Sequence, residues 1–370
     1  METPLFKDRI SRLRERLREE GVDGIWITQP ENRRYVSGFR ATDLQFTESS
    51  GSLLINEHRT VLLTDSRYTE EASREAAGFE VKTIQNGIVE GLPGILPDLK
   101  VRRVGFEKDY ITWGLHQELE KKLGELSPAV DLVPLDGIME EMREVKDEGE
   151  IVALQASADL ISTVMGRIID SLEPGLSERA IAWKVEELAR QGGAEDLAFP
   201  SIVASGPNSA LPHAVPTDRR LEQGEPVTLD LGVKLNGYCS DMTRTVFLGD
   251  PDPWFKTIYR TVRKAQTAAI REVHAGLETT FVDSIARDLI KQAGFGEYFG
   301  HGLGHGVGLA THEGPRLSPR KPTILKDGMV VTIEPGIYVP GKGGVRLEQM
   351  VLLTGGGVRI LTGDSNFYDF

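Results

Sequence analysis

Apolar residues recur at helical spacing at the start of the chain. Phe6, Ile10, Leu13 and Leu17 are separated mainly by charged residues, which predicts an amphipathic helix that ends at Gly21. Short apolar runs follow, and their alternation with helical patterns predicts a small α/β domain. The expected elements are a strand at 24–28, a hairpin with strands at 52–55 and 60–63, a helix at 68–77 and a strand at 101–106.

The pattern changes near residue 136. Residues 137–150, GIMEEMREVKDEGE, are strongly charged, and a long helical pattern then runs from Ile151 to Met165. A chain of 370 residues exceeds what one hydrophobic core usually organises. We therefore predict two domains, residues 1–136 and 137–370.

The second part contains an internal repeat. Helical segments that end at Gly193 and Gly294 are offset by 101 residues, and LEQGEPVTLDLG (221–232) matches LKDGMVVTIEPG (325–336) at an offset of 104. The second match aligns Asp230 with Glu334. Each half is expected to be helices followed by a hairpin, so we predict a pseudo-twofold αβ domain with a site shared between its halves.

Four carboxylates are expected to meet in that site. Asn236-Gly237 predicts a two-residue turn, which places Asp230 opposite Thr243 and makes Asp241 its diagonal neighbour, roughly 7 to 8 Å away. In the second half, Glu334 is expected on the first strand, a turn at 341–344, and Arg346 and Glu348 on one face of the returning strand. Such carboxylates would repel one another unless cations compensate them, and two divalent ions would do so.

A nitrogen ligand is expected from residues 300–309, GHGLGHGVGL. Glycine at every second position disfavours a helix, so we predict an extended segment. His301 and His305 would then lie roughly 13 Å apart, too far for both to bind one ion. One of them is expected to bind metal and the other to assist.

Composition narrows the function classes. The formal charge of -13 and the pI near 5.2 argue against non-specific binding of nucleic acid or anionic membranes. No apolar run approaches the roughly 20 residues that span a bilayer, so we expect no membrane insertion. The start of the chain has no signal-peptide pattern and the single Cys239 cannot form an internal disulfide, which favours a cytoplasmic location. The tryptophans expected in the core are Trp26, Trp113, Trp183 and Trp254.

The ordered motifs resemble those of the pita-bread metallopeptidases, namely aminopeptidase P, prolidase and methionine aminopeptidase. The shared pattern is two Asp eleven positions apart (230 and 241), then HGLGHGVGLATHE (301–313), an EPG turn (334–336) and a GVRLE strand (344–348). The stretches NRRYVSGF (32–39) and TDSRY (64–68) are similar to the additional domain of the proline-specific members and of creatinase. The resemblance implies an α/β (α+β) chain, with a creatinase/prolidase-type N-terminal α/β domain before a pita-bread catalytic domain.

The resemblance also implies roles for individual residues. His213 and His312 would contact the substrate and stabilise the intermediate, His301 and Arg346 would assist, and Glu334 would relay the proton of the attacking water. Gln349 is a departure, because these relatives usually have Asp after the last ligand. The implied ligands of two divalent ions are Asp230, Asp241, His305, Glu334 and Glu348. We expect manganese by family habit, although Co²⁺, Zn²⁺ or Fe²⁺ also suits this ligand set.

The leading functional hypothesis is an Xaa-Pro aminopeptidase that acts on small peptides with proline in second position. The alternatives are a prolidase restricted to Xaa-Pro dipeptides and a metal-dependent hydrolase of small amides on the same fold. Creatinase lacks the metal ligands, which argues against a metal-free amidinohydrolase. A non-enzymatic binding module that has lost the metal ligands is also disfavoured, because this chain keeps the whole set of ligand candidates. A homodimer is expected from the resemblance alone.

Overall fold

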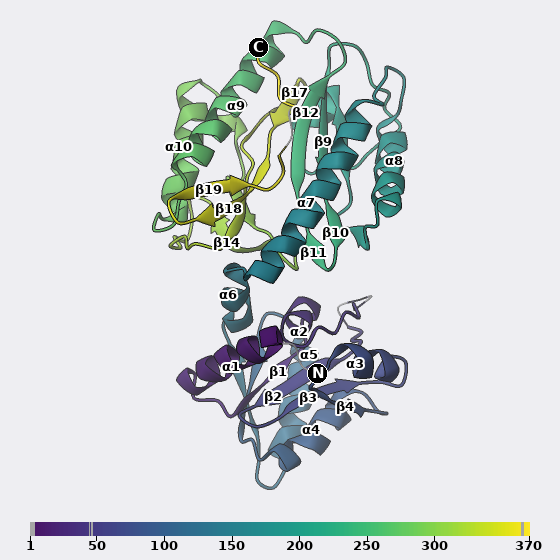
Figure 1. The fold of residues 1–370 in the computed structure, drawn as a ribbon, viewed down its shortest axis with the longest axis vertical. Helices are drawn as coiled ribbons and strands as arrows, with labels where there is room; N and C mark the ends of the chain where they lie inside the picture. Colours follow the sequence, from purple (N-terminus) through teal and green to yellow (C-terminus); the bar gives the residue numbers. More distant parts are fainter. Residues whose placement is uncertain (1–3, 44, 46, 364–365) are drawn as a thin grey trace. The chain divides into compact units, whose positions relative to one another are not determined.

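The computed structural model describes residues 4–43, 45, 47–363 and 366–370. The chain divides into two compact units, one ending at Met142 and one beginning at Arg143. The sequence analysis divides it at residue 136. Colours in Figure 1 follow the sequence, so the first unit is purple to blue and the second is teal to yellow.

The first unit is built on one six-stranded sheet with the order β4-β3-β2-β1-β5-β6. β1, β5 and β6 are parallel, whereas β2 runs antiparallel to both β1 and β3. The predicted opening helix, hairpin and following elements are confirmed. The strands are β1 (Gly24–Ile27), β2 (Ser52–Asn56), β3 (Thr60–Thr64), β4 (Glu80–Thr83), β5 (Arg103–Glu107) and β6 (Asp131–Leu135).

Helices cover both faces of this sheet. Side chains alternate along β1, so Trp26 packs with α4 and α5 in one core, while Ile25 and Ile27 are buried outside that core. α1 packs against α2 and β1. The helices are α1 (Pro4–Glu19), α2 (Pro30–Ser37), α3 (Thr69–Glu75), α4 (Ile88–Leu99), α5 (Trp113–Gly124) and α6 (Ile138–Glu144), which crosses the division between the units.

The second unit contains two related sheets, each backed by a pair of helices. α7 (Glu148–Ile169) and α8 (Glu178–Gln191) pack on the sheet β12-β9-β8, and α9 (Pro253–Glu272) and α10 (Thr279–Gln292) on the sheet β14-β13-β15-β18-β19 (Figure 1). The first-half strands are β7 (Asp196–Leu197), β8 (Ile202–Ser205), β9 (Pro226–Leu231), β10 (Val233–Leu235), β11 (Tyr238–Cys239) and β12 (Met242–Phe247). The second-half strands are β13 (Gly304–Gly306), β14 (Glu313–Leu317), β15 (Val330–Ile333), β16 (Gly336–Val339), β17 (Gly343–Arg346), β18 (Gln349–Thr354) and β19 (Gly357–Ile360). Two short 3₁₀ helices are η1 (Gly206–Ala210) and η2 (Gly296–Tyr298).

The internal repeat is present in the backbone. α8 and α10 have equal length and start 101 residues apart, at Glu178 and Thr279. Gly175 and Gly276 precede these helices with φ of 93° and 92°, a conformation that side chains with a Cβ disfavour. Each of these glycines donates its amide to a leucine carbonyl of its own half, at 2.9 Å in the first and 2.8 Å in the second. The predicted pseudo-twofold arrangement is therefore observed.

The predicted hairpin register is confirmed in the first half. Asp230 pairs with Thr243, and Leu235 with Tyr238 across a two-residue turn. Both turn residues have positive φ, 52° at Asn236 and 83° at Gly237, as a type I′ turn requires. In the second half Val339 pairs with Gly343, so the turn lies at 340–342 rather than at 341–344.

Other sequence expectations need correction. Of the segment 300–309, only Gly304–Gly306 is a strand, because Phe299, His301 and Leu303 bond to side chains of α10 instead of a neighbouring strand. Glu334 lies one residue beyond β15.

Two further expectations concern α7 and the tryptophans. One described helix, α7, is long and apolar enough to cross a membrane by length and composition, contrary to the expectation that no such run exists. Its buried side chains pack in the cores of the second unit. Trp113 and Trp183 are 71% and 72% exposed, so they are not core residues.

Candidate metal centre

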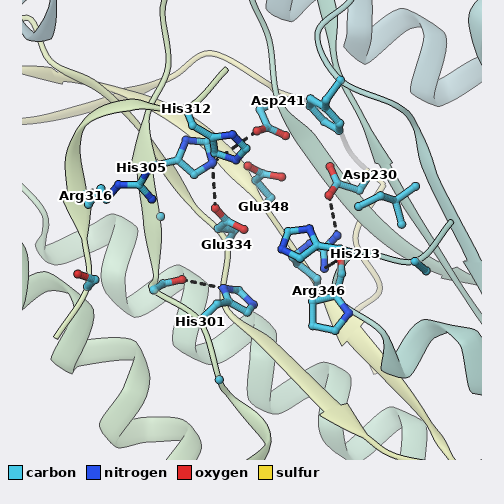
Figure 2. Close-up of a pocket in the computed structure, with 18 of the residues that line it drawn as sticks. His213, Asp230, Asp241, His301, His305, His312, Arg316, Glu334, Arg346 and Glu348 are labelled. Carbon is cyan, nitrogen blue, oxygen red and sulfur yellow. Dashed lines mark hydrogen bonds and ion pairs between the residues drawn. The ribbon is translucent and has the colours of Figure 1, made fainter. Parts of the chain in front are cut away.

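All nine candidate residues line one cavity in the second unit, of about 660 Å³. Figure 2 shows their side chains converging from both halves of the repeat. The nine are His213, Asp230, Asp241, His301, His305, His312, Glu334, Arg346 and Glu348.

Three carboxylates meet at the centre of this cavity. Asp230 lies on β9, Asp241 precedes β12, and Glu348 lies between β17 and β18. One oxygen from each lies within 4.8 Å of the other two, and the three residues are at most 9% exposed. Because the register of β9 and β12 and the second hairpin both fix this meeting, the backbone of the two halves dictates the cluster.

His305 and Glu334 complete the group from the second half. His305 Nε2 lies 3.6 Å from Asp241 Oδ2 and 3.3 Å from Glu334 Oε1. The other ring nitrogen, Nδ1, lies 3.0 Å from the carbonyl oxygen of Gly306 and donates to it in the neutral tautomer. While the ring is protonated, Nε2 donates to Glu334, and loss of that proton leaves the lone pair that a metal ligand needs.

The electrostatics of this cluster call for cations. Burial, together with the charges of Glu348 and Asp230, raises the pKa of Asp241 well above its usual value. Burial and the charge of Glu334 raise the pKa of Glu348 to about 8. Although burial opposes it, the hydrogen bond with His305 lowers the pKa of Glu334 to about 2. Without a cation, the negative charge on one carboxylate therefore disfavours ionisation of its neighbours.

Two buried oxygens support a metal fit directly. Asp230 Oδ1 and Glu348 Oε1 are buried without a hydrogen-bond partner among the described residues. The second oxygen of each carboxylate has a hydrogen-bond partner. Arg346 donates to Asp230 Oδ2 at 2.6 Å, and Thr243 donates to Glu348 Oε2 at 2.8 Å. Each carboxylate therefore presents one fixed, unpaired oxygen to the cavity, which suits a hard divalent ion.

A hydrogen-bonded chain joins the assisting residues. Arg346 donates to the hydroxyl of Tyr338 at 2.8 Å, and that hydroxyl lies 2.9 Å from His301 Nε2. His301 Nδ1 lies 2.8 Å from the carbonyl oxygen of Gly302 and burial lowers the pKa of His301, so its ring is neutral and accepts from Tyr338. The chain links the guanidinium on Asp230 to an imidazole on the cavity wall.

The two remaining histidines lie at the cavity wall as well. The rings of His312 and His305 are 4.3 Å apart, and burial and the neighbouring His305 lower the pKa of His312. His213 lies on an exposed loop whose Pro212 carbonyl accepts from Arg346 at 3.2 Å. The structure thus brings every predicted site residue to one cavity.

Several functional contacts escaped sequence reasoning. Tyr338 follows the EPG turn, but no motif in the sequence marks it as functional. Thr243 is predicted from the sequence only as the residue opposite Asp230. Arg316, on β14 directly opposite His305, and Arg320 also line the cavity. The basic stretch PRLSPRK (315–321) soon after His312 is the signal that could have indicated them.

Comparison with known proteins places the chain. Residues 152–355 match metallopeptidase family M24, and residues 9–145 match the creatinase/prolidase N-terminal domain. The chain belongs to metallopeptidase family M24. A curated relative, the Xaa-Pro dipeptidase of Pyrococcus horikoshii, is 36% identical over 97% of this chain and 97% of its own.

Solved structures agree with this assignment. The Xaa-Pro dipeptidase from Bacillus anthracis is 37% identical with a TM-score of 0.90, covering 97% of this chain and 98% of that one. The X-Pro aminopeptidase from Thermotoga maritima MSB8 is 36% identical with a TM-score of 0.85, covering 96% and 97%. The predicted fold, a creatinase-type domain followed by a pita-bread domain, is confirmed. The protein is a metallopeptidase of the prolidase type, and its family implies a divalent metal.

Proposed function

We propose that the protein hydrolyses the bond between a first residue and proline, with Xaa-Pro dipeptides as its main substrates. The observation that carries the proposal is one cavity that is lined both by the five metal-ligand candidates and by two arginines, Arg316 and Arg320, which we call the basic rim. Relatives named Xaa-Pro dipeptidase support the reaction class. The cytoplasmic location and the homodimer stay predictions.

The proposed ligands are the five donors at the centre of the cavity. Two divalent ions bound there, with manganese the first choice, would supply an acidified water and polarise the substrate carbonyl. Four carboxylates and one imidazole match hard or borderline divalent ions better than thiolate-binding ones. The set is Asp230, Asp241, His305, Glu334 and Glu348.

The other residues act on protons and on the substrate. Glu334 Oε1 lies 3.1 Å from the Thr332 hydroxyl and 3.3 Å from His305 Nε2. A Glu334 carboxylate that binds metal through one oxygen would accept the proton of the attacking water on the other. His312 and His213 face the cavity and would donate hydrogen bonds to the substrate oxygen as charge develops on it.

The basic rim favours a dipeptide. Arg316 and Arg320 line the cavity, and Arg316 lies close enough to His312 to lower its pKa. A free carboxylate follows proline immediately in an Xaa-Pro dipeptide, and a guanidinium binds a carboxylate bidentately. A longer peptide places an uncharged amide there. The leading sequence hypothesis, an aminopeptidase, is thus the second candidate, and the Thermotoga maritima relative favours it.

The test is product analysis of the Mn²⁺-loaded enzyme on Xaa-Pro and Xaa-Pro-Yaa, with a chelated control. The proposal expects efficient cleavage of the dipeptide, and Arg316→Ala is expected to raise KM for it about tenfold or more while sparing the tripeptide. Preferential release of the first residue from the tripeptide would establish the aminopeptidase instead. Failure to cut either peptide with any divalent metal would overturn both.

A further inference from the structure

The loop that carries His213 has little regular structure of its own. After η1, no described residue between Leu211 and Glu225 belongs to a strand or helix. Leu211 and Val215 flank His213 and are 57% and 78% exposed. A loop of this kind would sample many conformations unless other groups fix it.

One buried carboxylate binds residues on both sides of His213, at positions 205 and 217. Glu178, the first residue of α8, is fully buried (0% exposed). Its Oε1 accepts from the amide and hydroxyl of Ser205 at 2.7 and 2.8 Å, and its Oε2 accepts from the amide and hydroxyl of Thr217 at 3.0 and 2.6 Å. Asn208 Nδ2 reaches both oxygens at 3.1 Å. The carboxylate therefore ties together residues on either side of His213.

Charge strengthens this clamp. Burial raises the pKa of Glu178, but the hydrogen bonds from Thr217 and Ser205 outweigh burial and leave the pKa below its usual value. The carboxylate is ionised at neutral pH, and hydrogen bonds to an ionised acceptor are about twice as strong as neutral ones.

The internal repeat shows that the clamp belongs to one half only. Thr279 occupies the place of Glu178 at the start of α10. Its hydroxyl accepts from the amide of Thr323 at 3.1 Å, and no second segment bonds to that hydroxyl among the described residues. A carboxylate is thus not needed to start this helix, and Glu178 serves the segment after β8, whereas the matching segment after β13 contains the strand β14.

We propose that Glu178 is a positioning residue that fixes the 205–217 loop and so places His213 at the substrate. The inner side of the loop is held separately, because Ala214 packs with Ile202 and Ala204 and Pro212 accepts from Arg346. Ser205 pairs with Val227, the carbonyl of Thr217 accepts from the amide of Arg179, and Glu178 joins these two residues to each other. This role in catalysis rests on the proposed function, whereas the clamp itself does not.

The test is a double-mutant cycle with Glu178→Gln and His213→Ala in the metal-loaded enzyme. Glu178→Gln is expected to lower kcat/KM for an Xaa-Pro dipeptide about tenfold, the range found for groups that orient active-site residues. In the His213→Ala background the same change is expected to cost less than about twofold, because the residue that it positions is already gone. An equal loss in both backgrounds would show a merely structural role and overturn the proposal.

A second readout does not need activity. Hydrogen exchange at the amides of residues 211–217 is expected to accelerate in Glu178→Gln, and to stay unchanged in the matched control Thr279→Val. Thr217→Val removes one arm only and serves if Glu178→Gln fails to fold. Unchanged exchange in the loop would overturn the clamp. If the wild type cleaves no Xaa-Pro peptide, the proposed function fails while exchange still decides the clamp.

Discussion

The two halves of the catalytic unit share a scaffold but not their chemistry. β8 and β13 occupy the same place beside their hairpins, because Ser205 pairs with Val227 and Gly306 with Val331, which are repeat equivalents. By this alignment Ala204 stands in the first half where His305 stands in the second. Each half supplies two of the proposed carboxylate ligands, and the proposed imidazole ligand, His305, comes from the second.

The two halves show how a duplicated fold forms an asymmetric site. Both halves also bring a histidine to the cavity wall on a loop, but they hold it differently. In the first half Glu178 binds the loop of His213. In the second half Arg287, paired with Asp283 at 2.7 Å, donates to the carbonyl of His301 at 2.7 Å. Repetition fixes the strands, and specific side chains then differentiate the loops.

The largest effect is expected from Asp241→Ala, which removes one of the two carboxylates that the first half supplies to the central cluster. The variant is expected to lose bound divalent metal and to fall to background activity, because no other described side chain replaces this oxygen between Asp230 and Glu348. Metal analysis and dipeptide turnover check this, with circular dichroism as the control for folding. Unchanged turnover would refute the proposed centre.

A large change in stability is expected from Glu313→Gln. Glu313 binds Arg143 and, at 2.6 Å, Lys146, and all three side chains are at most 5% exposed. The substitution removes the carboxylate charge between two buried cations, so it costs about 3 kcal/mol at pH 7. Burial raises its pKa, but Lys146 and Arg143 hold it below the usual value. Its contribution is thus present above the ordinary carboxyl pKa and is lost as pH falls through the folded-state pKa.

Denaturation of Glu313→Gln and wild type at pH 7 and pH 3 measures this, and the gap between them should shrink at pH 3. Glu178→Gln in the first half is expected to cost less at pH 7, since its partners are neutral. A gap for Glu313→Gln that does not change with pH would contradict the ion-pair account.

A smaller loss of activity is expected from Tyr338→Phe, which breaks the chain between Arg346 and His301. We expect kcat/KM to fall about tenfold, within the range for groups that orient active-site residues, with metal content unchanged. Tyr238→Phe is the matched control, because that hydroxyl bonds Glu150 and does not line the cavity. Equal losses in the two variants would argue against the chain.

The smallest effect is expected at the hairpin turn of the first half. Gly237 has φ of 83°, so Gly237→Ala should lower the free energy of unfolding by about 1 kcal/mol. Lys342→Ala in the three-residue turn of the second half is the control and should change stability by less than about 0.5 kcal/mol. Chemical denaturation of both variants measures the difference. Equal stability would contradict the strain assigned to the two-residue turn.

Local rules predicted much of this molecule from its sequence. The Asn236-Gly237 turn set the register that pairs Asp230 with Thr243, and the constant repeat offset located α8 and α10. The roles of Glu178 and Tyr338 were not predictable in this way. The side-chain partners of Glu178 lie 27 or more residues from it in the sequence, and His301 lies 37 residues from Tyr338. Only the folded chain therefore shows these contacts.

We propose that five residues from two unequal halves hold two divalent ions. Anomalous diffraction from crystals grown with Mn²⁺ tests it most directly. The account predicts two peaks in the cavity, bound by Asp230, Asp241, Glu348, Glu334 and the Nε2 of His305. A single peak, or peaks bound by other residues, would contradict it.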